Sequence, residues 1–261
     1  MLSRNLEKAV AAYHRRDPEA SRQAHLSSAR EEHRTEQGRF IKSVVYGGLD
    51  GIITTFAVVA GVAGASLQPS IILILGFANL IADGLSMAIG DFLSTRAEKE
   101  YEASERRREE WEVDHYPEGE RREMVELYTH KGIDREDAEV IAATLSKYHE
   151  AWVDIMMVEE LGIVFSDESP WKNALATFFS FAIFGFVPLL AYIVAGLAPI
   201  IQQHSFLTAS ILTGLTLFVL GALKTGLTGR RWFRSGLEML VVGGAAAAAA
   251  YGIGYLLARI V

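Results

Sequence analysis

The chain has 261 residues, half of them hydrophobic, with a mean hydropathy of +0.19 and a formal net charge of −7. It is too apolar for an ordinary soluble domain of this length, and we predict an all-α polytopic membrane protein. The absence of cysteine excludes disulfides and thiolate metal ligands, and the acidic balance argues against nucleic acid as a partner.

The polar segment 1–40 is rich in charge and contains no apolar run. It therefore lacks the pattern of a cleavable secretory signal. Basic residues precede the first apolar stretch, and we expect them to form a cytoplasmic flank: Arg22, Arg30, Arg34, Arg39 and Lys42. The sequence assigns no role to residues 1–37.

Five later segments are long and apolar enough to cross a bilayer, which takes about 20 residues. They run roughly over Ser43–Leu67, Ser70–Leu93, Ala174–Ala195, Ser205–Leu223 and Leu237–Leu257. We divide the rest of the chain accordingly into spans one and two (41–96), an acidic module (97–168) and spans three to five (169–261).

The charges of the loops predict the orientation of the spans. The connections 66–70 and 196–205 carry no charge, whereas the loop 224–235 carries Lys224, Arg230, Arg231 and Arg234. Together with the basic flank, this distribution places the N-terminus, the acidic module and the loop 224–235 in the cytoplasm. The C-terminus is then expected on the far side.

Two carboxylates lie inside the first two spans, Asp50 in span one and Asp83 in span two. An ionisable residue costs at least about 2.5–3.5 kcal/mol within a span, so both are functional candidates. Asn79, Asp83 and Met87 follow one another at intervals of one helical turn, and we interpret this stripe as a pore lining. The alternative is that Asp50 and Asp83 only hydrogen-bond neighbouring helices.

The acidic module holds 22 acidic and 9 basic residues, a net charge of −13, while the remainder of the chain carries +6. We predict a module of three helices, with breaks at Pro117 and Gly132. The first continues out of span two to about Val113, the second covers Glu120–His130, and the third runs from Asp134 to Leu161. The apolar face of the third helix comprises Ile141, Leu145, Tyr148, Trp152 and Ile155.

A stripe of glutamates follows span two at helical spacing: Glu98, Glu102, Glu105, Glu109 and Glu112. In a hairpin across Pro117, the pair Glu109 and Glu112 can converge with Glu120 and Glu123. The third helix adds Met156, Met157 and Glu160. Carboxylates with a thioether suit Fe²⁺ or Mn²⁺ better than Mg²⁺ or Ca²⁺. The alternative is a solvated face on which Arg106, Arg107 and Arg108 pair with glutamates.

Two other classes of protein compete with a metal-transport interpretation. A membrane-anchored di-iron ferritin-like oxidase or iron-storage protein requires Glu-x-x-His on two helices, and only Glu112 with His115 fits. A scaffold that binds basic proteins through the acidic module leaves Asp50 and Asp83 unexplained. Nothing resembles a Walker loop, so ATP-driven pumping has no support.

Two motifs resemble signatures of the vacuolar iron transporter family. They are Tyr46-Gly-Gly-Leu-Asp50-Gly in span one and Asp83-Gly-Leu-Ser-Met87-Ala-Ile-Gly in span two, and the resemblance covers residues 38–260. It implies a prokaryote-like member that acts as a homodimer and moves Fe²⁺, and often Mn²⁺, out of the cytoplasm in exchange for protons. No enzyme activity and no prosthetic group are expected.

The resemblance also implies roles for particular residues. Asp50 and Met87 are the implied translocation ligands. The implied cytoplasmic metal-collecting site comprises Glu102 or Glu105, Glu109, Glu112, Glu120, Glu123, Met156 or Met157, and Glu160. Plant-type members carry a glutamate where this chain has Asn79, and Asp83 one turn later is a candidate replacement. We expect a prokaryotic cytoplasmic membrane as the location, with the vacuolar membrane as the alternative.

Overall fold

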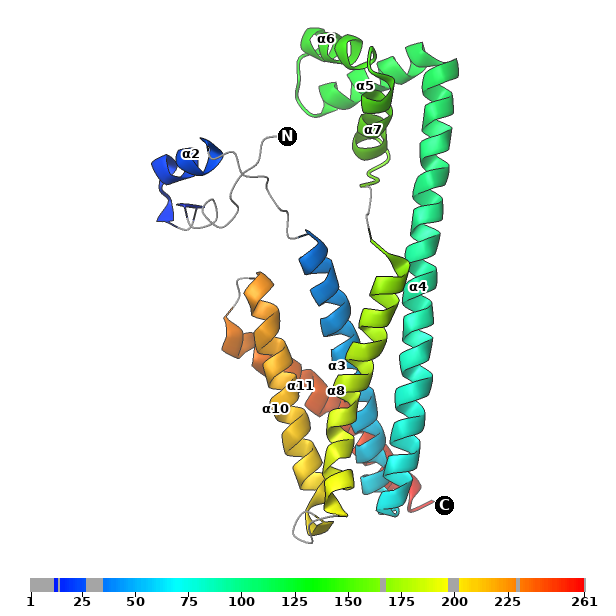
Figure 1. Ribbon diagram of the computed structural model, residues 1–261, viewed down its shortest axis with the longest axis vertical. Helices are drawn as coiled ribbons and strands as arrows, with labels where there is room; N and C mark the ends of the chain where they lie inside the picture. The colour runs from blue at the N-terminus through cyan, green and yellow to red at the C-terminus, as the bar shows by residue number, and fades with distance from the viewer. Residues whose placement is uncertain are drawn as a thin grey trace. The chain divides into compact units, whose positions relative to one another are not determined.

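The computed structural model describes residues 12–13, 15–26, 35–164, 168–196, 202–228 and 231–260. The elements labelled in Figure 1 are all helices, which confirms the predicted all-α class. They are α2 (Pro18–Leu26), α3 (Thr35–Gly64), α4 (Pro69–His115), α5 (Pro117–His130), α6 (Arg135–Leu145), α7 (His149–Glu159), α8 (Pro170–Ala195), α10 (Ser205–Thr228) and α11 (Trp232–Leu257). The basic residues Arg30, Arg34 and Arg230 and residues 197–201 of the connection 196–205 lie outside the described residues.

Five of these helices, α3, α4, α8, α10 and α11, are long and apolar enough to cross a membrane. The apolar stretches include Ser43–Gly64 in α3 and Ser205–Thr225 in α10. This confirms the predicted number of spans. Helix α4 begins at Pro69 and continues without interruption to His115, well beyond the apolar stretch with which it starts.

Among the described residues, those up to Ala88 and those from Leu175 onward form one compact unit. In this unit, helix α3 contacts both α10 and α11. The main hydrophobic core of the unit includes Phe56, Phe181 and Leu189. Small residues allow the backbones to approach closely. A Cβ atom added at Gly51 would overlap the backbone of Phe181 on α8, so this contact requires glycine, as in many helix pairs in lipid.

Residues Ile89–Ala174 form the second compact unit, with a hydrophobic core of its own. The core joins Val113 of α4, Met124 of α5, Ala142 of α6 and Trp152 of α7. The predicted break before α5 is shorter than expected, because only Tyr116 separates α4 from α5. Pro117 lacks an N–H and opens α5 at its first position, where that donor would be unpaired anyway.

The prediction of a single third helix over Asp134–Leu161 was wrong at its middle. A turn over residues 146–148 separates α6 from α7, and Tyr148 adopts φ −123° and ψ 87° there. Tyr148 is consequently exposed and does not join the apolar face, whereas Trp152 is buried. No glycine or proline marks this turn, and the apolar spacing continues across it, so the sequence pattern contains no stop signal.

Candidate metal centre

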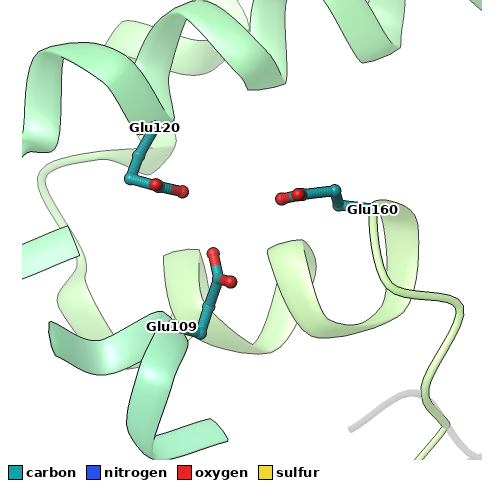
Figure 2. Close-up of side chains that lie close together, drawn as sticks. All are labelled: Glu109, Glu120 and Glu160. Atoms are coloured by element: carbon teal, nitrogen blue, oxygen red, sulfur yellow. The ribbon is translucent and has the colours of Figure 1, made fainter. Parts of the chain in front are cut away.

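Three glutamates from three different helices meet in the second unit (Figure 2). Glu109 lies on α4, Glu120 in the first turn of α5, and Glu160 caps the C-terminal end of α7. Each offers a carboxylate oxygen, and these atoms lie within 4.8 Å of one another. Oxygens bound to one cation at about 2.0–2.6 Å are at most about 4–5 Å apart, so small side-chain rotations suffice to close this group around a metal ion.

The turns of the chain explain why these side chains meet. A single residue separates α4 from α5, and the chain changes direction there, so that Glu109, near the end of α4, lies close to Glu120 at the start of α5 (Figure 2). Glu160 follows the last residue of α7, and its backbone N–H bonds the carbonyl of Met156. Gly162 ends this segment with φ +67°, a conformation that glycine adopts without strain.

Burial makes this group of acids unusual. Glu109 is only 1 % exposed and Glu120 only 5 % exposed, although charged side chains are rarely buried without a partner. Burial, followed by the charge of Glu109 and a hydrogen bond between the two acids, raises the pKa of Glu120 to about 8. Burial also raises the pKa of Glu109. The pair therefore retains a proton near neutral pH.

Glu160 completes the cluster from the solvent side. Burial of its carboxyl group, then the charges of Glu109 and Glu123, raise its pKa to about 7. A divalent cation would remove the repulsion that causes part of these shifts, and it would displace the protons that the acids hold.

Two buried oxygens in the cluster lack an ordinary donor. Within the described residues, no N–H or O–H group donates a hydrogen bond to Oε1 of Glu109 or to Oε2 of Glu120. Leaving a buried acceptor unsatisfied costs about 1–3 kcal/mol or more. A bound cation, a proton shared by the two acids or an ordered water between them would satisfy both atoms.

The other predicted ligands of the module lie in varied surroundings. Glu105 and Glu112 are both in ion pairs with Arg108. Glu123 is exposed, but its charge contributes to the raised pKa of each member of the cluster. Glu102 is buried and lies outside the group of three.

The two methionines are part of the hydrophobic core. Met156 and Met157 are 0 % exposed and pack in the cluster that contains Trp152 and Val153. Their thioethers are close to Glu160 in sequence, but apolar side chains surround them. Sequence spacing predicted that they and Glu160 occupy the end of one helix, but not that both side chains are enclosed.

The histidines contribute to other contacts. Nδ1 of His115 lies 2.8 Å from the carbonyl oxygen of Trp111, and the two rings stack. Nε2 of His149 lies 3.0 Å from a carboxylate oxygen of Asp114. Among the described residues, the candidate metal group contains glutamates and no histidine. The geometry thus does not assemble the Glu-x-x-His pairs of a di-iron enzyme.

The residues predicted to line a pathway all belong to the first unit. Asp50 on α3 and Asp83 on α4 are close enough to interact electrostatically. Met87 packs against the hydrophobic core, and the buried Nδ2 of Asn79 has no partner among the described residues. Sequence reasoning missed Thr55, a fully buried side chain whose hydroxyl also lacks a partner in the described structure. Its signal was the Thr-Thr pair within an apolar span.

Five candidate spans and a compact group of three carboxylates, two of them buried, define a multi-pass membrane protein with a candidate site for a metal ion. Comparison with known proteins agrees with this class. Residues 41–255 match the VIT family. The chain is 42 % identical to a vacuolar iron transporter of Toxoplasma gondii, over 99 % of this chain and 90 % of the relative.

Two further relatives extend this comparison. A vacuolar iron transporter of Plasmodium falciparum is 34 % identical over 93 % of each chain. Vacuolar iron transporter 1 of Arabidopsis thaliana is 33 % identical over 89 % of this chain and 92 % of its own length. The chain belongs to the VIT family, the vacuolar iron transporter family. This confirms the expected resemblance and the expectation of a transporter rather than an enzyme.

Proposed function

We propose that this protein transports Fe²⁺, and also Mn²⁺, out of the cytoplasm in exchange for protons. The observation that carries the proposal is the cluster of Glu109, Glu120 and Glu160, which contains two buried oxygens without an ordinary donor. Carboxylate oxygens bind divalent cations, Mn²⁺, Mg²⁺ and Ca²⁺ among them. The names of the relatives, which are iron transporters, support iron as the principal cargo.

In this proposal, the acidic module 97–168 lies in the cytoplasm and collects the ion. Four further glutamates add negative charge around the three central carboxylates: Glu102, Glu105, Glu112 and Glu123. This charge raises the local concentration of cations. Met156 and Met157 would offer a softer ligand if a side chain turned toward the cluster. The basic residues around the spans support the cytoplasmic orientation.

The ion then crosses the membrane along the side chains of Asp50, Asn79, Asp83 and Met87. Asp50 and Asp83 provide negative charge within the spans. A charged side chain is costly there, so both residues are candidates for a functional role. A carboxylate that takes up a proton loses its affinity for the metal, and this supplies a physical route to antiport.

A homodimer is the proposed assembly. Helix α4 exposes large apolar side chains along one side, among them Ile74, Ile81 and Leu85. Lipid or a second copy of α4 would cover such a surface.

The prokaryotic cytoplasmic membrane expected from the sequence remains a prediction, and the names of the relatives favour the vacuolar membrane. In either membrane, transport would begin in the cytoplasm.

Transport by the purified protein in sealed liposomes tests the proposal. With a pH gradient imposed, we expect uptake of Fe²⁺ and a coupled flux of protons in the opposite direction. Asp50→Ala and Met87→Ala should abolish uptake, whereas Glu98→Ala, in the glutamate stripe but outside the cluster, should leave it unchanged. Uptake by the Asp50 and Met87 variants at the wild-type rate would contradict the assigned pathway, and a wild-type protein without Fe²⁺ uptake would contradict the function.

A further inference from the structure

Arg108 lies on α4 immediately before Glu109 and binds two of the glutamates proposed to collect metal. Its Nη2 donates to Oε2 of Glu105 at 2.7 Å, and its Nη1 donates to Oε2 of Glu112 at 3.2 Å. Nε donates to the same Glu105 oxygen at 3.2 Å. One guanidinium group thus occupies carboxylate oxygens on both sides of Glu109 along the helix.

The charge of Arg108 also reaches the central cluster. It opposes the rise in pKa of Glu109 and of Glu160, so the guanidinium is within electrostatic range of glutamates on two different helices. The side chain is 46 % exposed, and its partners are less exposed than it is. Arg108 is therefore at the solvent edge of the acidic group.

We propose that Arg108 is a built-in counter-cation of this metal site. In the metal-free protein it neutralises Glu105 and Glu112; an arriving divalent cation displaces it from Glu112, and it returns when the ion leaves. This inference rests on the proposed function and adds a residue that sets the affinity of the site. Arg108 acts through the glutamates and is a positioning residue, not a metal ligand.

The contacts are suited to such an exchange. Both partners are on the same helix as Arg108, three residues before it and four after it, so the guanidinium can leave without any movement of the backbone. Half-exposed ion pairs at helical spacing are weak, and a divalent cation competes with them effectively. The competition lowers the affinity of the site and speeds release, which a transporter needs because a cargo held too tightly does not move on.

Metal binding by the full-length protein in detergent tests this inference, with Mn²⁺ as the probe. Arg108→Ala should tighten Mn²⁺ binding about two- to fivefold, the size expected for a weak surface ion pair, and should slow release to a chelator. Arg108→Lys keeps the charge but loses the forked geometry, and it should give an intermediate affinity. Arg107→Ala is the matched control, because it removes the same charge from an exposed neighbour and should leave affinity unchanged.

Transport supplies a second readout. Arg108→Ala should lower the Mn²⁺ or Fe²⁺ concentration that gives half-maximal uptake and should also lower the maximal rate. Unchanged or weaker binding by Arg108→Ala would overturn the inference, as would equal tightening by Arg107→Ala, which would show a simple effect of net charge. If the wild-type protein binds no Mn²⁺ and no Fe²⁺, the proposed function fails as well; wild-type binding without an Arg108 effect overturns the inference alone.

Discussion

Glu109 and Glu120 are two buried acids on adjacent helices whose carboxylate oxygens lie within 4.8 Å of each other. Two negative charges this close repel each other where little water can screen them, so deprotonation of both acids is disfavoured. Burial and the charge of Glu109 raise the pKa of Glu120 to about 8, and burial raises the pKa of Glu109. A cation that binds here near neutral pH therefore has to displace a proton.

The stability of the metal-free protein should depend on pH through this cluster. The pKa of Glu120 is raised to about 8 and that of Glu160 to about 7, from 4.5. The folded state thus binds more protons than the unfolded state, so these groups stabilise the fold fully below about pH 4.5, and this stabilisation is lost as pH rises to about 8. Thermal melts between about pH 5 and pH 8.5 should show the decline.

Glu120→Gln should flatten this pH dependence, because the amide keeps a hydrogen-bond donor at every pH. The matched control is Glu118→Gln, an exposed position in the same first turn of α5. A wild-type melting temperature that rises steadily over the same interval would contradict the assigned protonation.

Metal binding should release protons. At about pH 7 the cluster retains protons on Glu120 and partly on Glu160, and a divalent cation must displace them. Calorimetry of Mn²⁺ binding in buffers with different ionisation enthalpies measures the number released. We expect about one to two protons per ion near neutral pH and fewer above about pH 8.5, with a smaller number for Glu120→Gln. A buffer-independent enthalpy at neutral pH would contradict the prediction.

Arg106 should hold α7 in the position that the metal site requires. Its guanidinium binds Glu110 on α4 at 2.9 Å, and Glu150 and Asp154 on α7 at 2.9 and 2.5 Å. Arg106→Ala frees the start of α7, which carries Glu160 at its other end. We expect about tenfold weaker Mn²⁺ binding, with a loss of stability of only about 1 kcal/mol because the pairs are partly exposed.

Three variants separate this role of Arg106 from general destabilisation. Arg106→Lys should restore part of the affinity, and Arg107→Ala should have little effect on either quantity. If Arg106→Ala lowers the melting temperature but leaves Mn²⁺ affinity intact, Arg106 stabilises the fold without positioning Glu160.

The close contact of α3 with α8 should be intolerant of even one methyl group. A Cβ atom at Gly51 would overlap the backbone of Phe181, which cannot rotate away. Gly51→Ala should therefore cost about 1–3 kcal/mol and displace the neighbouring Asp50, with loss of transport. Gly244→Ala on α11 is the control, since an added Cβ atom there meets no atom within 4 Å. Equal thermal stability of the two variants in detergent would contradict the packing.

The sequence contained good signals for the spans and weaker ones for the module. Hydropathy over about 20 residues identifies a membrane helix, because lipid imposes this length on any chain that crosses it. The turn between α6 and α7 had no such signal: the residues around Tyr148 are moderate helix formers, and tertiary packing decides between a turn and a continuous helix.

The candidate site was predictable only in part. Helical spacing and the break at Pro117 predicted that Glu109 and Glu120 approach each other. Spacing could not show which glutamates are buried and which are paired, since both depend on neighbours distant in sequence or on the choice of rotamer. Arg108 illustrates this limit, because it had several possible glutamate partners at helical spacing and the fold selects Glu105 and Glu112.

The enclosure of Met156 and Met157 has a consequence for chemical durability. Ferrous iron reacts with peroxide to give oxidants, and sulfur is the side-chain atom that they attack most readily. The chain has no cysteine, and the two thioethers nearest to the cluster in sequence are sealed within apolar packing. Carboxylates resist such oxidants, so the cluster of Glu109, Glu120 and Glu160 offers Fe²⁺ oxygen ligands that survive the exposure.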